Sequence, residues 1–223
     1  MKNKLKKVLA FTASLSMCSS MLLNVPYGTF SLGLSAIAAE EDVEINEDNF
    51  PDETFRTYVA ENFDTTDDGI LTAEEIAAVT KIAFYSARIN NVSDLTGVEH
   101  FTALTELYCQ SNQLESLDVS NNTALTTLSC FNNKLTSLDV SNNTSLESLA
   151  CYNNNLTSLD VSNNTVLTYL DCSENQLTSM DVSKNTALTY LDCDDNQLTS
   201  LDVSKNTALT YLDCDDNQLT SLM

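Results

Sequence analysis

Histidine, tryptophan, glycine and proline are nearly missing from this chain of 223 residues. It has one histidine, His100, no tryptophan, four glycines and two prolines. A catalytic triad centred on histidine, or a metal site built from several histidines, therefore has almost nothing to draw on. Phosphate-binding glycine loops are excluded as well, because only Gly69 and Gly97 lie beyond residue 39. The composition thus argues against most familiar classes of enzyme.

Positive charge is also scarce. Ten Lys and Arg stand against 32 Asp and Glu, so the formal net charge is −22, and four of the ten basic residues lie within the first seven positions. A chain this acidic repels phosphate backbones and anionic membrane surfaces. We therefore expect that the protein has no nucleic-acid partner.

The N-terminus has the pattern of a secretory signal peptide. Lysines within residues 2–7 precede two apolar stretches, and Ala36 and Ala38 fit the small-x-small cleavage pattern. The sequence predicts a signal peptide over residues 1–39, which implies a secreted or cell-surface protein; an uncleaved anchor is the alternative. Beyond residue 40 no stretch is long and apolar enough to span a bilayer, so no transmembrane segment is expected in the mature chain.

Most of the remaining sequence is a repeat of 21 residues over 104–223. Its first leucine returns without gaps, and the sixth copy stops after 15 residues at Met223; these leucines are Leu104, Leu125, Leu146, Leu167, Leu188 and Leu209. Self-similarity at this period predicts a solenoid, in which each repeat stacks on its neighbours. Each copy has two halves, Leu-x-x-Leu-x-Cys-x-x-Asn and Leu-x-x-Leu-x-Val-x-x-Asn. Their alternation predicts one short strand and a second extended segment per turn.

Asparagines close both halves of the repeat. With no Gly or Pro beyond residue 104, the corners must use Asn, Asp and Ser, which tolerate turn conformations. We predict two buried amide ladders. The first comprises Asn112, Asn133, Asn154, Asn175, Asn196 and Asn217, and the second comprises Asn122, Asn143, Asn164, Asn185 and Asn206.

The block resembles a leucine-rich repeat, in which Cys here replaces the third leucine. Its nested form is similar to the short 21-residue type of secreted and surface proteins of gut bacteria. Residues 79–103 resemble the degenerate first turn of internalin-like surface proteins, with apolar residues at Val79, Ile82, Phe84, Ile89 and Val92. The resemblance implies a curved parallel-strand solenoid that recognises proteins or glycans on its concave face and has no catalysis of its own.

Residues 40–78 have the pattern of a small helix-loop-helix cap at the N-terminal end of the solenoid. Pro51 is expected to open a helix with an apolar stripe at Phe55, Val59 and Phe63, and Thr72 begins a second helix. The loop between them, residues 64–75, fits the EF-hand pattern. It predicts a weak calcium site from Asp64, Thr66, Asp68, the carbonyl of Ile70, and Glu75. The metal-free alternative is a capping box of Thr72 with Glu75 and an ordinary turn at Asp68-Gly69.

Six cysteines occupy one repeat position: Cys109, Cys130, Cys151, Cys172, Cys193 and Cys214. They alternate with inward leucines, so we predict a ladder of buried, reduced thiols. Disulfides are the alternative in a secreted chain. Strands in register place equivalent residues about 4.8 Å apart, whereas a disulfide needs Cβ atoms about 3.8 Å apart.

The outward side chains beside these leucines and cysteines are the predicted binding residues. They form an aromatic stripe and an acidic ladder, namely Tyr108, Phe131, Tyr152, Tyr169, Asp171, Tyr190, Asp192, Tyr211 and Asp213. Tyrosine and phenylalanine are favoured interface anchors, although such residues also serve merely to cover a sheet and keep it soluble.

The function predicted from the sequence is a secreted or cell-surface binding protein with a protein or glycan partner. The alternative is the targeting region of a longer surface protein or enzyme that is cut short at Met223. A hydrolase that uses Asp192 and Asp213 is disfavoured, because equivalent acids repeat identically and nothing separates their pKa values.

Overall fold

The structure is a computed structural model that describes residues 42–84 and 91–222. The described residues all belong to one compact unit. The predicted signal peptide and Ile89 of the predicted first turn lie outside the described residues. Within the described ranges, no helix is both long enough and apolar enough to cross a membrane.

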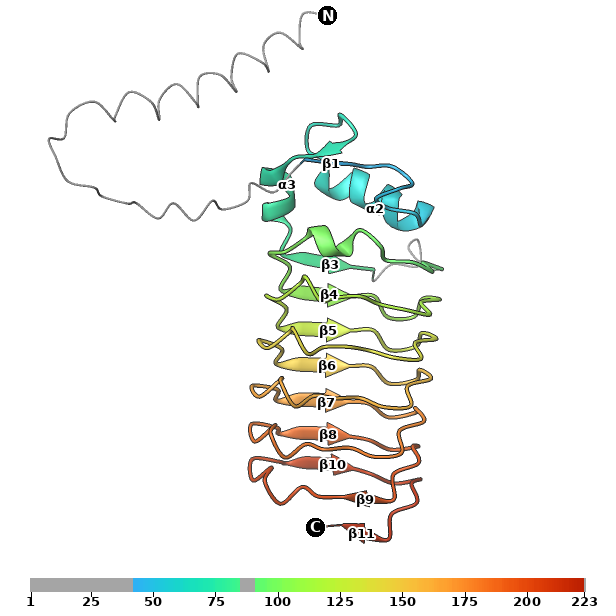
Figure 1. Cartoon of the computed structure of the whole chain (residues 1–223), viewed down its shortest axis with the longest axis vertical. Coiled ribbons are helices and arrows are strands. Elements are labelled where there is room, and N and C mark those ends of the chain that lie inside the picture. The colour runs from blue at the N-terminus through green and yellow to red at the C-terminus, as the bar shows by residue number, and fades with distance from the viewer. Residues whose placement is uncertain (1–41, 85–90, 223) are drawn as a thin grey trace, which may run out of the picture. The chain divides into compact units, whose positions relative to one another are not determined.

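Seven short parallel strands stack in one sheet, one strand for each turn of the chain (Figure 1). In spatial order they are β3 (Lys81–Ala83), β4 (Glu106–Tyr108), β5 (Thr127–Ser129), β6 (Ser148–Ala150), β7 (Tyr169–Asp171), β8 (Tyr190–Asp192) and β10 (Tyr211–Asp213). From β4 onward each pairing advances by one repeat, so that Leu107 pairs with Leu128 and Leu170 with Leu191. The predicted parallel-strand leucine-rich-repeat solenoid is therefore confirmed.

The second half of each repeat is extended as well, but it pairs less regularly. The strands β9 (Ser200–Leu201) and β11 (Ser221–Leu222) pair in parallel, and Asp118 forms an isolated parallel bridge with Asp139. Thus each turn contributes one strand to the main sheet and sends an extended segment back along another face.

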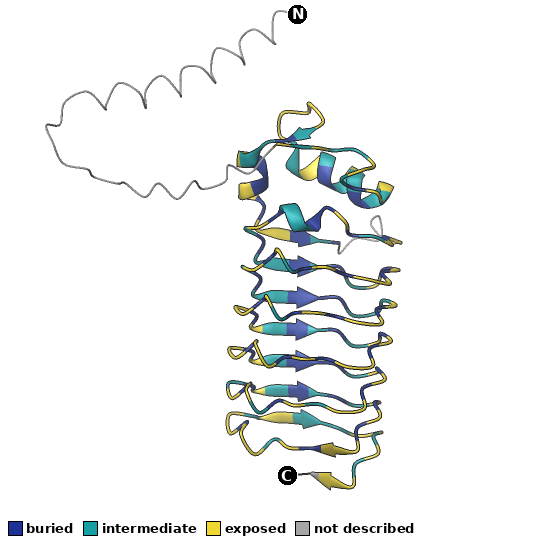
Figure 2. Cartoon of the chain, viewed as in Figure 1, coloured by how far each residue is buried: buried dark blue, intermediate teal, exposed yellow. Residues whose placement is uncertain are grey.

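The inward side chains of both halves fill one continuous core. In the first repeat Leu107, Cys109, Leu114 and Val119 are all completely buried, and the same positions recur down the stack (Figure 2). Burial of apolar side chains is the main stabilising contribution. Because each repeat contacts only its neighbours, stability builds up from a series of nearly identical interfaces.

The asparagines tie successive turns together through their side-chain amides. Asn143 Nδ2 donates to the carbonyls of Val119 and Asn122, at 3.0 and 2.9 Å. Asn154 Nδ2 donates to the carbonyls of Cys130 and Cys151, at 3.1 and 3.0 Å. The second ladder is fully buried as predicted, whereas Asn133 and Asn217 of the first ladder are only half-buried.

One corner of every repeat adopts a left-handed backbone conformation without glycine. The residues concerned are Ser111, Asn132, Asn153, Glu174, Asp195 and Asp216, with φ between 41 and 57°. Asn and Asp tolerate this region better than other side chains with a Cβ atom. Glu174, at φ 50°, is therefore the costliest residue for this corner among the later repeats.

The N-terminal cap consists of two helices and a small two-stranded antiparallel sheet. The helix α2 (Glu53–Phe63) is followed by β2 (Ile70–Leu71), which pairs antiparallel with β1 (Val43–Glu44), and then by α3 (Ala73–Ala78). A short 3₁₀ helix, η1 (Val98–His100), lies in the longer first turn.

The start of α2 differs from the prediction by two residues. Asp52 is the N-cap, and its Oδ1 accepts hydrogen bonds from the backbone N–H groups of Thr54 and Phe55, at 2.9 and 3.0 Å. Pro51 therefore precedes the cap instead of opening the helix. A capping carboxylate satisfies otherwise unpaired amides, which is why the aspartate determines the boundary.

Candidate binding face

The outward side chains of the seven strands lie in register as columns, which together we call the strand face. The first column comprises Lys81, Glu106, Thr127, Ser148, Tyr169, Tyr190 and Tyr211, and the second comprises Ala83, Tyr108, Ser129, Ala150, Asp171, Asp192 and Asp213. The third column, just beyond each cysteine, comprises Gln110, Phe131, Tyr152, Ser173, Asp194 and Asp215. The first two columns of the strand face thus change character along the solenoid, from small neutral side chains in the middle repeats to tyrosine and aspartate in the last three.

Three tyrosines of the first column stack on one another. The ring centroids of Tyr169 and Tyr190 lie 4.5 Å apart, and those of Tyr190 and Tyr211 lie 4.3 Å apart, with interplanar angles of 12° and 2°. Both faces of the Tyr190 ring are therefore covered by its neighbours. The hydroxyl edges of the stack remain directed at the second column.

Each stacked tyrosine holds the aspartate two residues further along its strand. The hydroxyls of Tyr190 and Tyr211 donate to Oδ2 of Asp192 and Asp213, both at 3.2 Å. The Oδ1 atoms of the same aspartates accept from the backbone N–H groups of Asp194 and Asp215, also at 3.2 Å. These carboxylates are thus held at both oxygens before any partner arrives.

The acidic residues of the strand face repel one another. Partial burial, together with the charges of Asp171 and Asp213, raises the pKa of Asp192. Burial, together with the charges of Asp213 and two neighbouring aspartates, raises the pKa of Asp194. The Oδ1 atom of Asp194 is also buried and has no hydrogen-bond partner. A positively charged partner would reduce the repulsion among these carboxylates and stabilise their charged forms.

Asp171 is less accessible than the sequence suggested. Only 8% of it is exposed, because its carboxylate accepts from the hydroxyls of Tyr169 and Ser173, at 3.4 and 2.8 Å. Ser129 of the same column is also buried. Asp171 is therefore nearly inaccessible to a partner. The accessible carboxylates of the second column are those of Asp192 and Asp213.

The other predicted aromatic residues form separate groups. Phe131 and Tyr152 stack in the third column at 4.3 Å and 10°. Tyr108 lies in the preceding repeat, where Lys81 approaches its ring to 4.8 Å and pairs with Glu106 at 2.6 Å. The structure thus brings the predicted aromatic residues together as two stacks, with Tyr108 beside Lys81, instead of a single stripe.

The cysteine ladder lies directly behind the strand face. All six repeat cysteines are free thiols, and all are buried except Cys214, which is half-buried. Burial raises the pKa of Cys109 and of Cys193 to about 12. Such thiols pack as small apolar groups and are poor nucleophiles.

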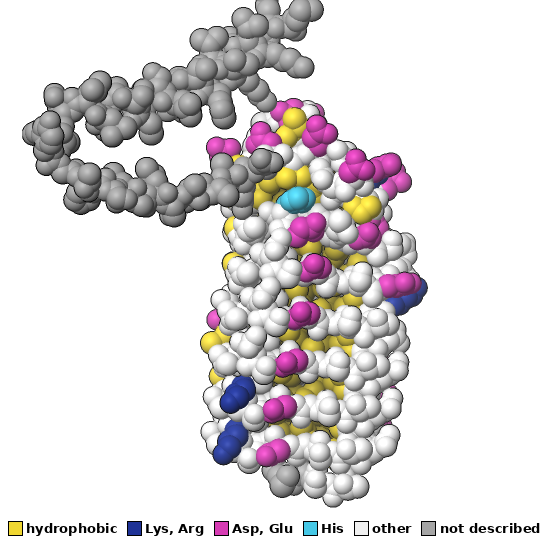
Figure 3. Space-filling view, in the orientation of Figure 1, with side chains coloured by type: hydrophobic (Ala, Val, Ile, Leu, Met, Phe, Trp, Pro, Cys, Tyr) yellow, Lys and Arg dark blue, Asp and Glu magenta, His cyan; other side chains and the backbone are white. Residues whose placement is uncertain are grey.

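A second acidic column was missed in the sequence analysis, although the repeated Asp-Val-Ser unit contains it. It comprises Asp118, Asp139, Asp160, Asp181 and Asp202. The negative charges of neighbouring members act to raise one another's pKa. A column of acidic side chains is visible down the face in Figure 3. Hydrogen bonds from the serine two residues later lower the pKa of each of these aspartates. These carboxylates therefore build turns, and Lys184 and Lys205 lie near the last two.

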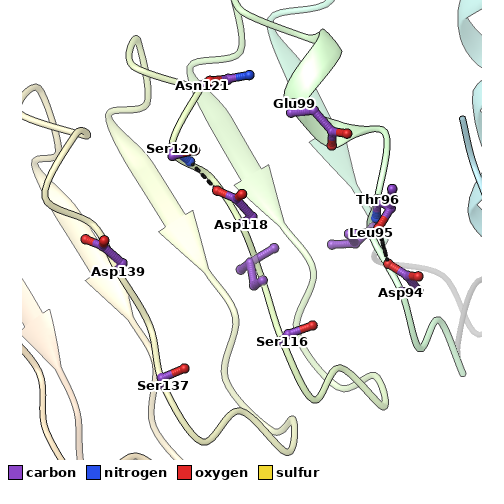
Figure 4. Close-up of a pocket in the computed structure, with 11 residues that line it drawn as sticks. Asp94, Leu95, Thr96, Glu99, Ser116, Asp118, Ser120, Asn121, Ser137 and Asp139 are labelled. Atoms are coloured by element: carbon purple, nitrogen blue, oxygen red, sulfur yellow. Dashed lines mark hydrogen bonds between the residues drawn. The ribbon is translucent and has the colours of Figure 1, made fainter.

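A polar hollow of about 720 Å³ lies between the long first turn and the first two repeats (Figure 4). Asp94, Glu99, Asp118 and Asp139 line it. Asp94 accepts from the N–H and hydroxyl of Thr96, at 2.8 and 2.7 Å. Glu99 accepts from a backbone N–H of the same turn. Local turn structure accounts for this acidic lining, so the strand face is the better candidate site.

The predicted calcium loop is held by hydrogen bonds within the protein. Glu75 Oε1 accepts from Thr65 N, Thr65 Oγ1 and Thr66 N, at 2.8, 2.6 and 3.2 Å. Its Oε2 accepts from the N–H and hydroxyl of Thr72, both at 2.9 Å. These donors lower the pKa of Glu75 to about 2.

The remaining predicted ligands are engaged in the same loop. Asp64 accepts from Gly69 N at 2.8 Å, and Asp68 accepts from Ile70 N at 3.1 Å. Within the described residues, no group of three or more His, Cys, Asp or Glu side chains is placed to hold a metal. In this arrangement a calcium ion would have to compete with the donors that both oxygens of Glu75 already bind. Calcium binding remains a prediction that only measurement tests.

Comparisons with known proteins agree with the repeat architecture. The family of leucine-rich repeats (two copies) matches residues 165–206. Internalin J of Listeria monocytogenes serotype 4b (strain F2365) is 46% identical over 75 residues, which are 34% of this chain and 8% of that protein. The chain therefore spans a small part of this relative's length.

Solved structures extend the similarity over most of the chain. The functional domain of InlJ from Listeria monocytogenes, which includes a cysteine ladder, is 36% identical with a TM-score of 0.55; the match covers 83% of this chain and 50% of that one. Internalin C2 from Listeria monocytogenes is 19% identical with a TM-score of 0.58, and the match covers 81% of this chain and 91% of that one. At that identity, the second match supports the fold alone.

Proposed function

Because the chain carries an internalin-like leucine-rich-repeat solenoid of the bacterial type, we propose that it is a secreted or cell-surface protein that recognises a partner through its strand face. The partner is a protein or a glycan, and the chain itself carries no catalytic centre. The observation that carries this proposal is the pre-organised row of tyrosine–aspartate pairs in the last three strands. Rigid side chains with satisfied hydrogen bonds lose little entropy on binding, which favours recognition.

The test is capture of a partner by the immobilised mature protein from extracts of cell surfaces. The variant Tyr190→Ala with Asp192→Ala removes one pair from the strand face. The partner captured by the wild type is identified by mass spectrometry, and its binding is then repeated with the purified partner. We expect the variant to lose this binding. The matched variant Asp181→Ala with Asp202→Ala should retain it. Unchanged capture by the first variant, with far-UV circular dichroism intact, would place the binding surface elsewhere.

The second candidate is the recognition region of a longer surface protein. It is favoured by the fraction of internalin J that the chain matches, 8%. The mass of the native protein, isolated from the producing cells and compared with that of residues 40–223, distinguishes the two proposals. N-terminal sequencing of the same sample tests the predicted cleavage near residue 39.

A further inference from the structure

Four carboxylates cluster at the C-terminal part of the strand face. Asp192 and Asp213 follow one another in the second column, with Asp194 and Asp215 beside them in the third. We call this set the aspartate block. Equivalent atoms of neighbouring strands lie about 4.8 Å apart, so four charges occupy an area that a few side chains of a partner would cover.

The aspartate block has no positive charge of its own. The salt bridges formed within residues 42–84 and 91–222 are Arg56 with Glu47 and Lys81 with Glu106, and both lie far along the chain from the block. Lys184 and Lys205 instead lie near the other acidic column, where they affect Asp181 and Asp202. The charge of the aspartate block is therefore left for a partner to neutralise.

The stacking of the tyrosines favours one class of partner at Tyr190, since of the last two rings only Tyr211 is exposed. A sugar ring binds an aromatic side chain through an open ring face, and a cation above a ring needs the same open face. Tyr190 has no open face, because Tyr169 and Tyr211 lie against it at 4.5 and 4.3 Å. What the stack offers at this position is a row of hydroxyl edges and fixed carboxylates. Paired carboxylates suit guanidinium and ammonium groups, which bind them through charge-assisted hydrogen bonds.

Building on the proposed function, we propose that the partner of the strand face is a protein segment rich in arginine or lysine, whose basic side chains bind the aspartate block. The carboxylates of Asp192 and Asp213 are already oriented by the hydroxyls of Tyr190 and Tyr211. Asp194 lies beside them and adds a further negative charge, and its buried Oδ1 has no hydrogen-bond partner. Neutral glycans can form hydrogen bonds with these groups but do not neutralise their charge.

The test measures fluorescence anisotropy of the mature protein with a labelled (Gly-Arg)₅ peptide, with (Gly-Gln)₅ and a neutral cello-oligosaccharide as comparison ligands. We expect the arginine peptide alone to bind, and its affinity to fall as NaCl rises from about 50 to about 300 mM. The variant Asp192→Asn with Asp213→Asn should weaken binding about tenfold or more. The matched variant Asp181→Asn with Asp202→Asn, which changes the net charge equally, should weaken it less than about threefold.

Three results would overturn the inference. They are equal losses in the two variants, equal binding of the neutral ligands, and no binding of the arginine peptide to the wild type. Failure here is distinguishable from failure of the proposed function. If capture depends on Tyr190 but the arginine peptide does not bind, the strand face is a binding surface for another class of partner. If the peptide binds at Asp192 and capture is unaffected by the Tyr190 variant, the proposed function is wrong and the inference stands.

Discussion

The hydroxyl of Tyr190 donates a hydrogen bond of 3.2 Å to Oδ2 of Asp192, two residues further along the same strand. The same pair recurs one repeat later as Tyr211 with Asp213. In each pair the tyrosine both stacks in its column and fixes a carboxylate in the next one. The pair is therefore the smallest unit of the strand face in which ring stacking and a fixed charge are linked.

Replacing Tyr190 by Phe tests the hydrogen bond alone, since the ring and its stacking are retained. The hydroxyl favours the charged form of Asp192, so its loss should raise the already elevated pKa of that carboxyl further. A carboxyl whose pKa is raised by folding destabilises the protein as pH rises through that pKa. The variant should therefore lose more stability at neutral pH than at about pH 3.

The pKa of Asp192 is measured by NMR titration of its carboxyl carbon, with thermal unfolding recorded at both pH values. Tyr211→Phe is the matched control, because its hydroxyl bonds Asp213 instead. A titration of Asp192 that is the same in the wild type and in Tyr190→Phe would show that this hydrogen bond does not form in solution.

The thiols of the cysteine ladder should be unreactive in the native protein. Burial raises the pKa of Cys109 to about 12 and leaves no path for a reagent. We expect Ellman's reagent to label Cys214 first, because it alone of the six is half-buried. All six should react after denaturation. Rapid native labelling of Cys151, identified by mass spectrometry, would contradict the inward ladder.

Glu174 should be a weak point of the solenoid. Its φ of 50° lies in the left-handed region, which costs a side chain such as Glu about 1 kcal/mol more than Asn. Glu174→Asn should therefore raise the free energy of unfolding by about 1 kcal/mol in urea denaturation. Asn153→Glu makes the reverse change one repeat earlier and should lower it by a similar amount. Equal and unchanged midpoints in both variants would refute the conformational argument.

Repeat arithmetic was enough to predict the register of the sheet. Because 21 residues separate equivalent positions, an inward Leu107 requires an inward Leu128, and the pairing of the two in the structure follows directly. The same reasoning placed Cys109 in the core and Tyr108 outside it. Burial of one face fixes register wherever side chains alternate, which makes this the most predictable part of the fold.

The details of the candidate site depended on features that periodicity does not carry. The burial of Asp171 results from the orientation of Tyr169 and Ser173 around it, and such orientations depend on rotamers. The hollow beside Asp94 results from the longer first turn, whose path differs from that of the repeat. The 21-residue period also implied that Asp118 and its equivalents form a column, but their role in the turns became clear only from the hydrogen bonds that they accept.

The last prediction concerns the five hydrogen bonds that Glu75 accepts. The carboxylate joins the start of the loop, at Thr65 and Thr66, to the start of α3, at Thr72. In Glu75→Gln one oxygen becomes an NH₂ group that faces donors, so at least two donors lose their partner. We expect a loss of about 1 to 3 kcal/mol in the free energy of unfolding at neutral pH.

The pH dependence of that loss has a definite sign. Folding lowers the pKa of Glu75 to about 2, from an ordinary value of about 4.3. Its stabilising contribution is therefore fully present above about pH 4.3 and disappears as pH falls through about 2. The difference in melting temperature between the wild type and Glu75→Gln should shrink over that range.

Unfolding in the presence and absence of calcium tests whether the EF-hand pattern of the loop also binds the ion. Because both oxygens of Glu75 already accept hydrogen bonds, calcium must compete with these donors. If the loop binds calcium as its EF-hand pattern predicts, millimolar calcium should raise the melting temperature of the wild type relative to a chelator. Equal melting temperatures would leave only the metal-free capping box. A bound ion present at 100 times its Kd would add about 2.7 kcal/mol, which thermal unfolding readily detects. A calcium-dependent rise that Glu75→Gln abolishes would show that the carboxylate exchanges its hydrogen bonds for the metal, and the predicted site would then stand. A rise that survives Glu75→Gln would place the ion elsewhere on this acidic chain.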